Sequence, residues 1–178
     1  MKNKGLYKLV ISALFLSMGM VLPLLTGQIK EIGDSLLPMH LPVMLCGAIC
    51  GWKYGFVVGA ILPFLRSLCF GMPPLYPNAV WMAVELSIYG LVIGIMYLGL
   101  ENRRGRTIIS LVTAMLCGRI GWGIAKSILL GVVGKGFTAE SFLVGGFVDS
   151  LPGIAVQIIL IPIILRSYER VLAKGSKV

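Results

Sequence analysis

The sequence predicts an all-α integral membrane protein with six transmembrane helices, both termini in the cytoplasm and an outward-facing cavity. The first observation is composition: 57% of the 178 residues are hydrophobic and 13% are charged, whereas soluble domains are about half apolar and about a quarter charged. The second is that long apolar stretches recur from end to end, which leaves no room for a soluble domain. The third is that basic residues gather in short clusters at the ends of these stretches. We therefore expect residues 1–178 to form a single six-helix membrane domain.

Six apolar segments, separated by turn-forming or charged residues, mark the expected spans. They lie at about residues 6–25, 35–51, 55–70, 78–98, 107–133 and 142–165. Residues 71–77 hold three prolines, which remove backbone donors and fix φ, so no helix is expected there. Asn78 follows this stretch and is expected to cap the fourth span. The second span is short, and Pro38 and Pro42 lie in its first turns, where proline is tolerated.

Charged residues in the tails and connecting loops indicate the orientation. In a six-span chain, both tails, the turn at Lys53 and the loop 101–106 with its three arginines fall on one side. The opposite loops carry Lys30 and Lys135 with acidic neighbours. Because basic loops stay in the cytoplasm, both termini are expected there. Topology thus accounts for the net charge of +9, and nucleic acid is not expected as a partner.

No cofactor, metal or catalytic set is expected. Cys46, Cys50, Cys69 and Cys117 lie in apolar runs, the sequence has no C-x-x-C pair, and His40 is the only histidine, so a zinc site is not expected. The common nucleophile, metalloprotease and phosphate-loop motifs are also missing. The sequence also lacks a Walker motif, so the chain is not expected to use ATP by itself. The first apolar run has no small-residue cleavage site and is expected to be a span rather than a signal peptide.

Five charged side chains lie inside apolar segments: Arg66, Glu85, Arg119, Lys126 and Asp149. A charge in hydrocarbon costs a few kcal/mol, so it is normally retained for a function. Counted from the expected span ends, all five lie between the midplane and the outer surface. The sequence therefore predicts one polar cavity that opens outward, and the excess of one positive charge suggests an anionic guest.

Further candidate binding residues share helical faces with these charges. On the fourth and fifth spans the candidates are Asn78, Trp81, Glu85, Tyr89, Arg119, Trp122 and Lys126. Their spacings of three and four residues place them on one face of each helix. Aromatic walls with a few fixed polar partners suit a small polar ligand. His40, at the outer mouth, is either a ligand contact or an exposed interface residue.

Simpler explanations stay open for these residues. Glu85 and Asp149 would also pair with Arg66 and Arg119 to hold the bundle together, although three cations face two anions. Lys126 would also reach the outer interface with its long side chain. The tryptophans would also serve packing or the aromatic belt.

Two stretches of the chain carry a family resemblance. One runs from His40-Leu41-Pro42-Val43-Met44-Leu45-Cys46-Gly47 to Gly51-Trp52-Lys53-Tyr54-Gly55, and the other from Gly71-Met72-Pro73-Pro74-Leu75-Tyr76-Pro77 to Glu85-Leu86 and Tyr89-Gly90. Together with six short spans and the absence of an energy module, they resemble the substrate-binding S component of an energy-coupling factor (ECF) vitamin transporter.

The resemblance implies a function, partners and a site. S components bind a vitamin or its precursor with high affinity from outside the bacterial plasma membrane, surrounded by membrane lipid. They associate through their first helices with a transmembrane T component and two cytosolic ATPases. The family's A-x-x-x-A contact motif corresponds here to Ala13 and Ser17, and small residues at this spacing let helices approach closely. The binding site is implied at the outer ends of spans four to six and the loops above them.

The identity of the guest and two other classes of function stay open. The positive surplus from Arg66, Arg119 and Lys126 favours a carboxylate, with pantothenate first and a phosphorylated or other carboxylated vitamin second, while thiamine, a cation, fits badly. A membrane-embedded enzyme would use Asp149 or Glu85 as a base on a lipid. A structural or regulatory membrane subunit would use the charges only as ion pairs. Because no nucleophile, base and orienting group occur together, an enzyme is not expected.

Overall fold

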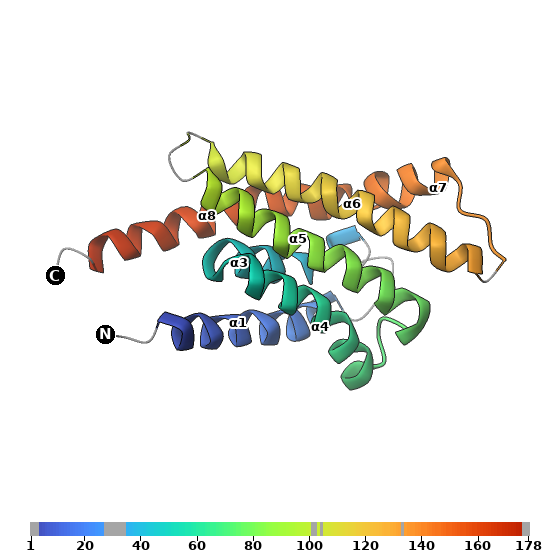
Figure 1. Ribbon diagram of the computed structural model, residues 1–178, viewed down its shortest axis with the longest axis horizontal. Helices are drawn as coiled ribbons and strands as arrows, with labels where there is room; N and C mark the ends of the chain where they lie inside the picture. Colours follow the sequence, from blue (N-terminus) through green and yellow to red (C-terminus); the bar gives the residue numbers. More distant parts are fainter. Residues whose placement is uncertain (1–3, 27–34, 101–102, 104, 133, 176–178) are drawn as a thin grey trace.

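The computed structural model is a bundle of helices (Figure 1). It describes residues 4–26, 35–100, 103, 105–132 and 134–175. The helices are α1 (Lys4–Val21), α3 (His40–Cys50), α4 (Trp52–Phe70), α5 (Val80–Gly99), α6 (Arg106–Val132), α7 (Ala139–Leu143) and α8 (Leu151–Gly175). Three short helical turns accompany them: η1 (Leu22–Thr26), η2 (Leu75–Ala79) and η3 (Val144–Val148). No strand occurs in the described residues, so the all-α prediction is confirmed.

In the described part of the chain, five helical segments are long and apolar enough to cross a membrane. They are Gly5–Leu25, Trp52–Phe70, Leu75–Gly99, Arg106–Val132 and Leu151–Val171. The second expected span, 35–51, is instead represented by α3 with 11 residues. At 1.5 Å per residue α3 is about 17 Å long, roughly half of the hydrocarbon core. It begins late because Leu37 has a φ of 50°, which a right-handed helix cannot contain.

Two further boundaries differ from the sequence prediction. The helix of the sixth expected span, α8, begins at Leu151 instead of near 142, because α7 and η3 occupy the preceding residues. Asn78 lies inside η2, and the residue before α5 is Ala79, which makes no side-chain capping bond. The predicted Asn78 cap is therefore wrong, because the chain already turns before α5 and leaves no free helix end at that residue.

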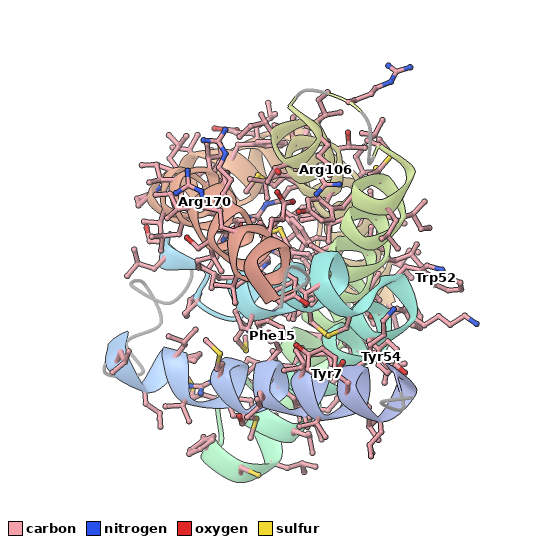
Figure 2. All side chains as sticks on the ribbon, turned by 90° about the vertical axis from the view of Figure 1, so that its left-hand side faces the viewer. Tyr7, Phe15, Trp52, Tyr54, Arg106 and Arg170 are labelled. Atoms are coloured by element: carbon pink, nitrogen blue, oxygen red, sulfur yellow. The ribbon has the colours of Figure 1, made fainter. Side chains whose placement is uncertain are left out.

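The first turn of α1 and the last turn of α8 lie at the same end of the bundle, on the left in Figure 1. We call this the terminal end and the opposite end the distal end. Figure 2 looks at the terminal end and places Trp52, Arg106 and Arg170 there. An arrangement with both termini at one basic end agrees with the expected topology, whose orientation stays a prediction. The expected polar stretch with Lys30 and Glu31 lies outside the described residues.

Helix α3 lies inside the bundle. It packs against α1, α4 and α5, and nine of its 11 residues are buried. Its Met44 and Leu45 belong to a group of buried side chains that we call the central cluster. The central cluster consists of Met44, Leu45, Ala48, Tyr89, Ile93, Tyr97, Leu111, Ala114, Met115, Ile161 and Leu165. It joins α3, α5, α6 and α8.

Three glycines let α3, α4 and α5 approach each other closely. A Cβ atom on Gly47 would lie 2.4 Å from the carbonyl oxygen of Gly90, and one on Gly55 would lie 2.6 Å from the same oxygen. These distances exclude any side chain larger than hydrogen. The backbones of α4 and α5 are therefore nearly in contact at Gly55 and Gly90. Gly51 has a different role, because its φ of 103° forms the single-residue turn between α3 and α4.

A polar network ties three helices together at the terminal end. The Tyr97 hydroxyl on α5 and the Arg106 guanidinium on α6 both donate to the Glu169 carboxylate on α8. The Arg106 guanidinium carbon also lies 4.4 Å from the centroid of the Tyr97 ring. This network fastens the terminal half of α8 to the α5–α6 pair.

Replacing Gly90 by alanine is expected to lower the stability of the protein, because the new methyl group would lie 2.3 Å from the Gly55 carbonyl carbon. Overpacking a dense core costs about 1–3 kcal/mol. The matched control is Gly131→Ala in α6, where nothing lies within 4 Å and alanine is the better helix former. Thermal unfolding of both variants in detergent is the measurement. Equal unfolding temperatures would show that the fold does not depend on this contact.

Candidate functional site

The Glu85 carboxylate is the centre of a buried polar cluster. Its Oε1 accepts a hydrogen bond of 2.8 Å from Arg119 Nη1, and His40 Nε2 lies 3.3 Å from the same oxygen. Glu85 belongs to α5, Arg119 to α6, and His40 is the first residue of α3. The fold therefore brings together three of the binding residues expected from the sequence. We call these three side chains the Glu85 cluster.

All three side chains are almost completely removed from solvent. The exposed fractions of His40, Glu85 and Arg119 are 1%, 2% and 3%. Moving a charge out of water costs several kcal/mol, and a hydrogen-bonded partner of opposite charge offsets part of that cost. Glu85 thus pairs with Arg119, as the simpler explanation expects. This pair leaves other polar atoms of the cluster without a hydrogen bond.

The polar atoms that remain are mainly hydrogen-bond donors. Arg119 Nε and Nη2 are buried without a hydrogen-bond partner, and so are both ring nitrogens of His40. His40 Nε2 approaches the carboxylate without the direction that a hydrogen bond requires, and its ring packs edge-on against Tyr89 with 5.0 Å between centroids. A buried polar atom without a partner costs about 1–3 kcal/mol. These atoms therefore mark a place where a ligand would add bonds.

Trp122 connects Arg119 with Lys126 along α6. The centroid of its ring lies 5.9 Å from the Arg119 guanidinium carbon and 4.4 Å from Lys126 Nζ. Lys126 Nζ also lies 5.4 Å from the Trp81 ring and 5.3 Å from the Phe137 ring. Cations within about 6 Å of an aromatic face are attracted by it. The aromatic and cationic residues expected on facing helices thus meet, and the ammonium of Lys126 lies among the rings.

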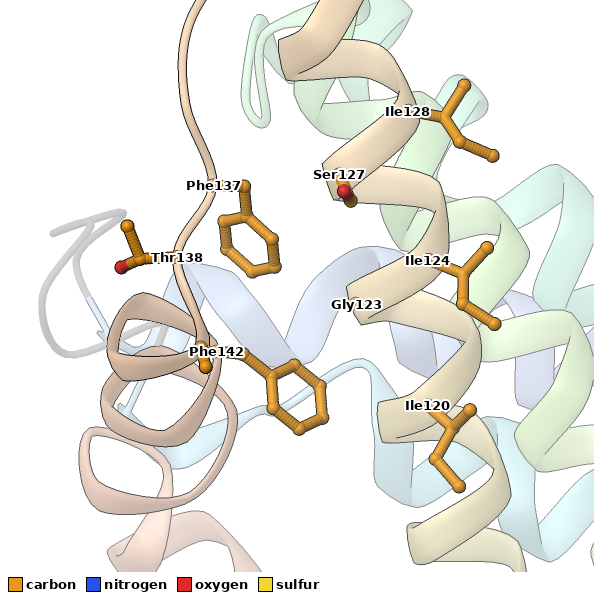
Figure 3. A pocket seen from close by; sticks show the side chains of 9 residues that line it. Ile120, Gly123, Ile124, Ser127, Ile128, Phe137, Thr138 and Phe142 are labelled. Carbon is orange, nitrogen blue, oxygen red and sulfur yellow. The ribbon is translucent and has the colours of Figure 1, made fainter.

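The segment 134–148, between α6 and α8, covers Trp122. Phe137 and Phe142 lie against the indole ring, with centroid distances of 5.9 Å and 6.1 Å. A pocket of about 510 Å³ lies between this segment and α6, and Figure 3 shows Phe137 and Phe142 facing α6 across it. The lining residues are Ile120, Gly123, Ile124, Ser127, Ile128, Phe137, Thr138, Ala139 and Phe142. None of these is charged, so the outward cavity lined by five charges stays a prediction.

Three of the expected site residues lie apart from the Glu85 cluster. Arg66 on α4 donates from Nη1 to the Met20 carbonyl oxygen at 2.7 Å, and its guanidinium carbon lies 5.4 Å from the Phe70 ring. Asp149 is exposed just before α8, and Asn78 is half-buried in η2. Arg66 therefore contacts α1, and the structure does not bring these three side chains to Glu85.

Gln157 on α8 was not expected among the site residues. Its exposed fraction is 1%, and its Nε2 has no hydrogen-bond partner. The signal that identifies it is its position as the only polar side chain between residues 151 and 165, since polar groups inside apolar spans tend to be functional. Its side chain is uncharged, so the pattern of charges in the spans does not include it. No three His, Cys, Asp or Glu side chains in the described part of the chain gather as a metal ion would require.

Helix α1 presents its pair of small residues on the surface of the bundle. Ala13 and Ser17 are both exposed, and the large side chains of Val10 and Leu14 beside them are exposed as well. The Ser17 hydroxyl donates to the Leu14 carbonyl oxygen at 2.8 Å. Because this bond satisfies the hydroxyl within the helix, the serine does not prevent an apolar helix from packing there.

Comparison with known proteins connects this architecture to one function class. A family model described as the substrate-specific component of ECF transporters matches residues 7–165. The match includes every residue of the Glu85 cluster and the exposed pair on α1. No curated protein and no solved structure gives a significant match.

Replacing Glu85 by glutamine is expected to destabilise the protein, because it leaves the Arg119 charge buried without its partner. Breaking a buried ion pair on one side costs about 3–5 kcal/mol. Arg170→Gln is the matched control, since Arg170 is exposed at the terminal end. Thermal unfolding in detergent is the measurement. The double change Glu85→Gln with Arg119→Met should recover part of the loss, and a double variant no more stable than Glu85→Gln would argue against the pair as a stabilising contact.

Proposed function

Because the chain belongs to the family of substrate-specific components of ECF transporters, we propose that it captures a carboxylated vitamin or precursor, with pantothenate as first candidate. Family membership makes it a membrane subunit that binds a small molecule for uptake, with a T component and ATPases as partners. In this proposal the distal end faces the outside of a bacterial plasma membrane and both termini lie in the cytoplasm. Two cytosolic ATPases supply the energy.

The observation that carries the proposal is the free edge of the Arg119 guanidinium. Nη1 donates to Glu85, whereas Nε and Nη2 are buried without partners. These two nitrogens form one side of the planar group and present two parallel N–H bonds. This fork matches the two oxygens of a carboxylate, which it binds through a pair of charge-assisted hydrogen bonds.

The surrounding charges also favour an anionic ligand. Arg119 and Glu85 form an ion pair, so the two free N–H groups of Arg119 are the polar groups that a ligand would meet first, and the Lys126 ammonium lies against the Trp122 ring. A cationic vitamin would need the aromatic faces of Trp81 and Trp122, where the Lys126 ammonium already lies. Thiamine, a cation, therefore fits less well than a carboxylate.

Ligand access requires a movement of the segment 134–148. Trp122, whose exposed fraction is 7%, separates the Glu85 cluster from this segment. The segment lies so close to α6 that a Cβ atom on Gly123 would be 2.5 Å from the Phe142 ring. In this proposal the segment swings away from α6, the pocket of about 510 Å³ widens, and the ligand passes Trp122 to reach Arg119.

The two other classes of function have less support. A lipid-modifying enzyme would need Glu85 or Asp149 as a base, but Glu85 is engaged by Arg119 and Asp149 is exposed. A purely structural subunit would explain the Glu85–Arg119 pair. It would not explain why two buried nitrogens of Arg119 have no partner.

Removal of the carboxylate from the ligand is expected to weaken binding strongly. A hydrogen bond to a charged group contributes about 1.5–3 kcal/mol, which corresponds to a change in Kd of roughly tenfold to a few hundredfold. The measurement is calorimetric titration of the detergent-solubilised protein with pantothenate and with its alcohol analogue. Arg119→Lys should lose much of this preference, because an ammonium lacks the planar fork. Equal affinity of the unmodified protein for the acid and the alcohol would refute the carboxylate proposal.

Replacing Ala13 or Ser17 by tryptophan is expected to reduce vitamin uptake while ligand affinity stays nearly unchanged. A bulky ring prevents the close helix approach that small residues allow, and both positions lie on the exposed face of α1, which we propose docks on the T component. Leu116→Trp on the exposed face of α6 is the matched control. Uptake is measured in cells that contain the complete transporter. Unchanged uptake by well-expressed α1 variants would exclude this face as the docking surface.

A further inference from the structure

Gln157 is a buried polar side chain in the distal half of α8. Its Nε2 has no hydrogen-bond partner although the residue is 1% exposed. Its neighbours on the same helical face are Ile154, which packs against the central cluster, and Ile161, which belongs to it. The amide of Gln157 therefore points toward the interior of the bundle, in line with side chains from α3, α5 and α6.

Gln157 lies on the distal side of the central cluster, as the members of the Glu85 cluster do. Each of the four polar residues is four positions away from a member of the central cluster, toward the distal end. The pairs are His40 with Met44, Glu85 with Tyr89, Arg119 with Met115, and Gln157 with Ile161. Helix α6 runs opposite to the other three helices (Figure 1). Residue numbers therefore rise toward the distal end in α6 and fall toward the distal end in α3, α5 and α8. Four residues correspond to about 6 Å along a helix axis, so all four side chains lie about one turn beyond a member of the apolar core on their own helices. We call these four side chains the polar layer.

The donors of this layer differ in charge. The free edge of Arg119 carries a positive charge and suits a carboxylate. The Gln157 amide is neutral, and its unpartnered atom is an N–H donor. A buried neutral donor on the same side of the core as a charged one is suited to an uncharged oxygen acceptor on the same ligand, because such a site rejects analogues that leave the donor unpaired.

We propose that Gln157 is a further ligand-binding residue and determines specificity for a neutral oxygen acceptor on the ligand. The ligand class is a carboxylate that also carries an amide, carbonyl or hydroxyl oxygen. This inference rests on the proposed function, because it adds a residue to the same site. It assigns the carboxylate to Arg119 and the neutral acceptor to Gln157.

A binding role and a structural role of Gln157 predict opposite effects of the same change. Leucine in place of Gln157 removes an unpartnered buried amide, which is costly in the absence of a ligand. The variant without ligand should therefore unfold at the same temperature as the original protein or at a higher one. A glutamine needed for structure would instead lower the unfolding temperature when replaced.

The test combines a change in the protein with a change in the ligand. Calorimetric titration compares pantothenate with an analogue in which an ethylene unit replaces the amide. The Gln157→Leu variant should bind pantothenate about tenfold more weakly, as expected for one lost hydrogen bond, and should bind the ethylene analogue as the original protein does. Ile161→Leu, a change of similar size one turn away, is the matched control and should keep both affinities.

Two results would overturn the assignment of Gln157. One is an unchanged affinity of Gln157→Leu for pantothenate. The other is an equal loss for both ligands together with a lower unfolding temperature, which would show a structural role. If the original protein binds neither probe, the proposed ligand is wrong, and native mass spectrometry of both purified proteins then decides. Retention of a small metabolite by the original protein and its loss from Gln157→Leu would support the assignment; equal retention, or no retention by either, would refute it.

Discussion

The direct contact between the backbones of α3, α4 and α5 is the constraint on which the rest of the structure depends. Because Gly47, Gly55 and Gly90 have no side chains, α3 fits between its neighbours with its backbone almost touching theirs. A short helix is then held inside the bundle with nearly all of its surface buried. Its first residue, His40, consequently lies beside Glu85. In a helix that crosses the whole membrane, the first residue would instead lie near the membrane surface.

The Glu85 cluster combines a stabilising pair with polar atoms that cost stability. The Arg119–Glu85 bond holds α5 to α6, while other nitrogens of Arg119 and His40 stay without partners. Such incomplete satisfaction is expected where a protein gives up stability for function. The central cluster supports this layer from below with tightly packed apolar side chains, so the polar groups keep their positions although few bonds fix them.

The sequence pointed to the charged residues that lie inside the spans, whereas it did not report the direction of each side chain around its helix axis. Counting residues from span ends placed Glu85, Arg119 and Lys126 near one another. The structure pairs Glu85 with Arg119, and Lys126 lies against the Trp122 ring, about two turns further along α6. Arg66 was expected with them, but α4 turns it toward α1, where a carbonyl oxygen accepts its hydrogen bond. Direction depends on how each helix packs against its neighbours, which hydropathy does not report. Hydropathy also missed the length of α3, because one residue with positive φ, Leu37, interrupts an otherwise apolar stretch.

The short length of α3 has a consequence for membrane insertion. Eleven residues are too few to cross the hydrocarbon core alone. Because Gly51 joins α3 directly to α4, we expect the two helices to enter the bilayer together as a helical hairpin. Their glycine surface is complete only when Gly90 arrives from α5. The 35 residues from Gly55 to Gly90 take about 2–7 s to synthesise at 5–20 residues per second. During that interval the glycine surface of α3 and α4 lacks the helix that covers it in the folded protein.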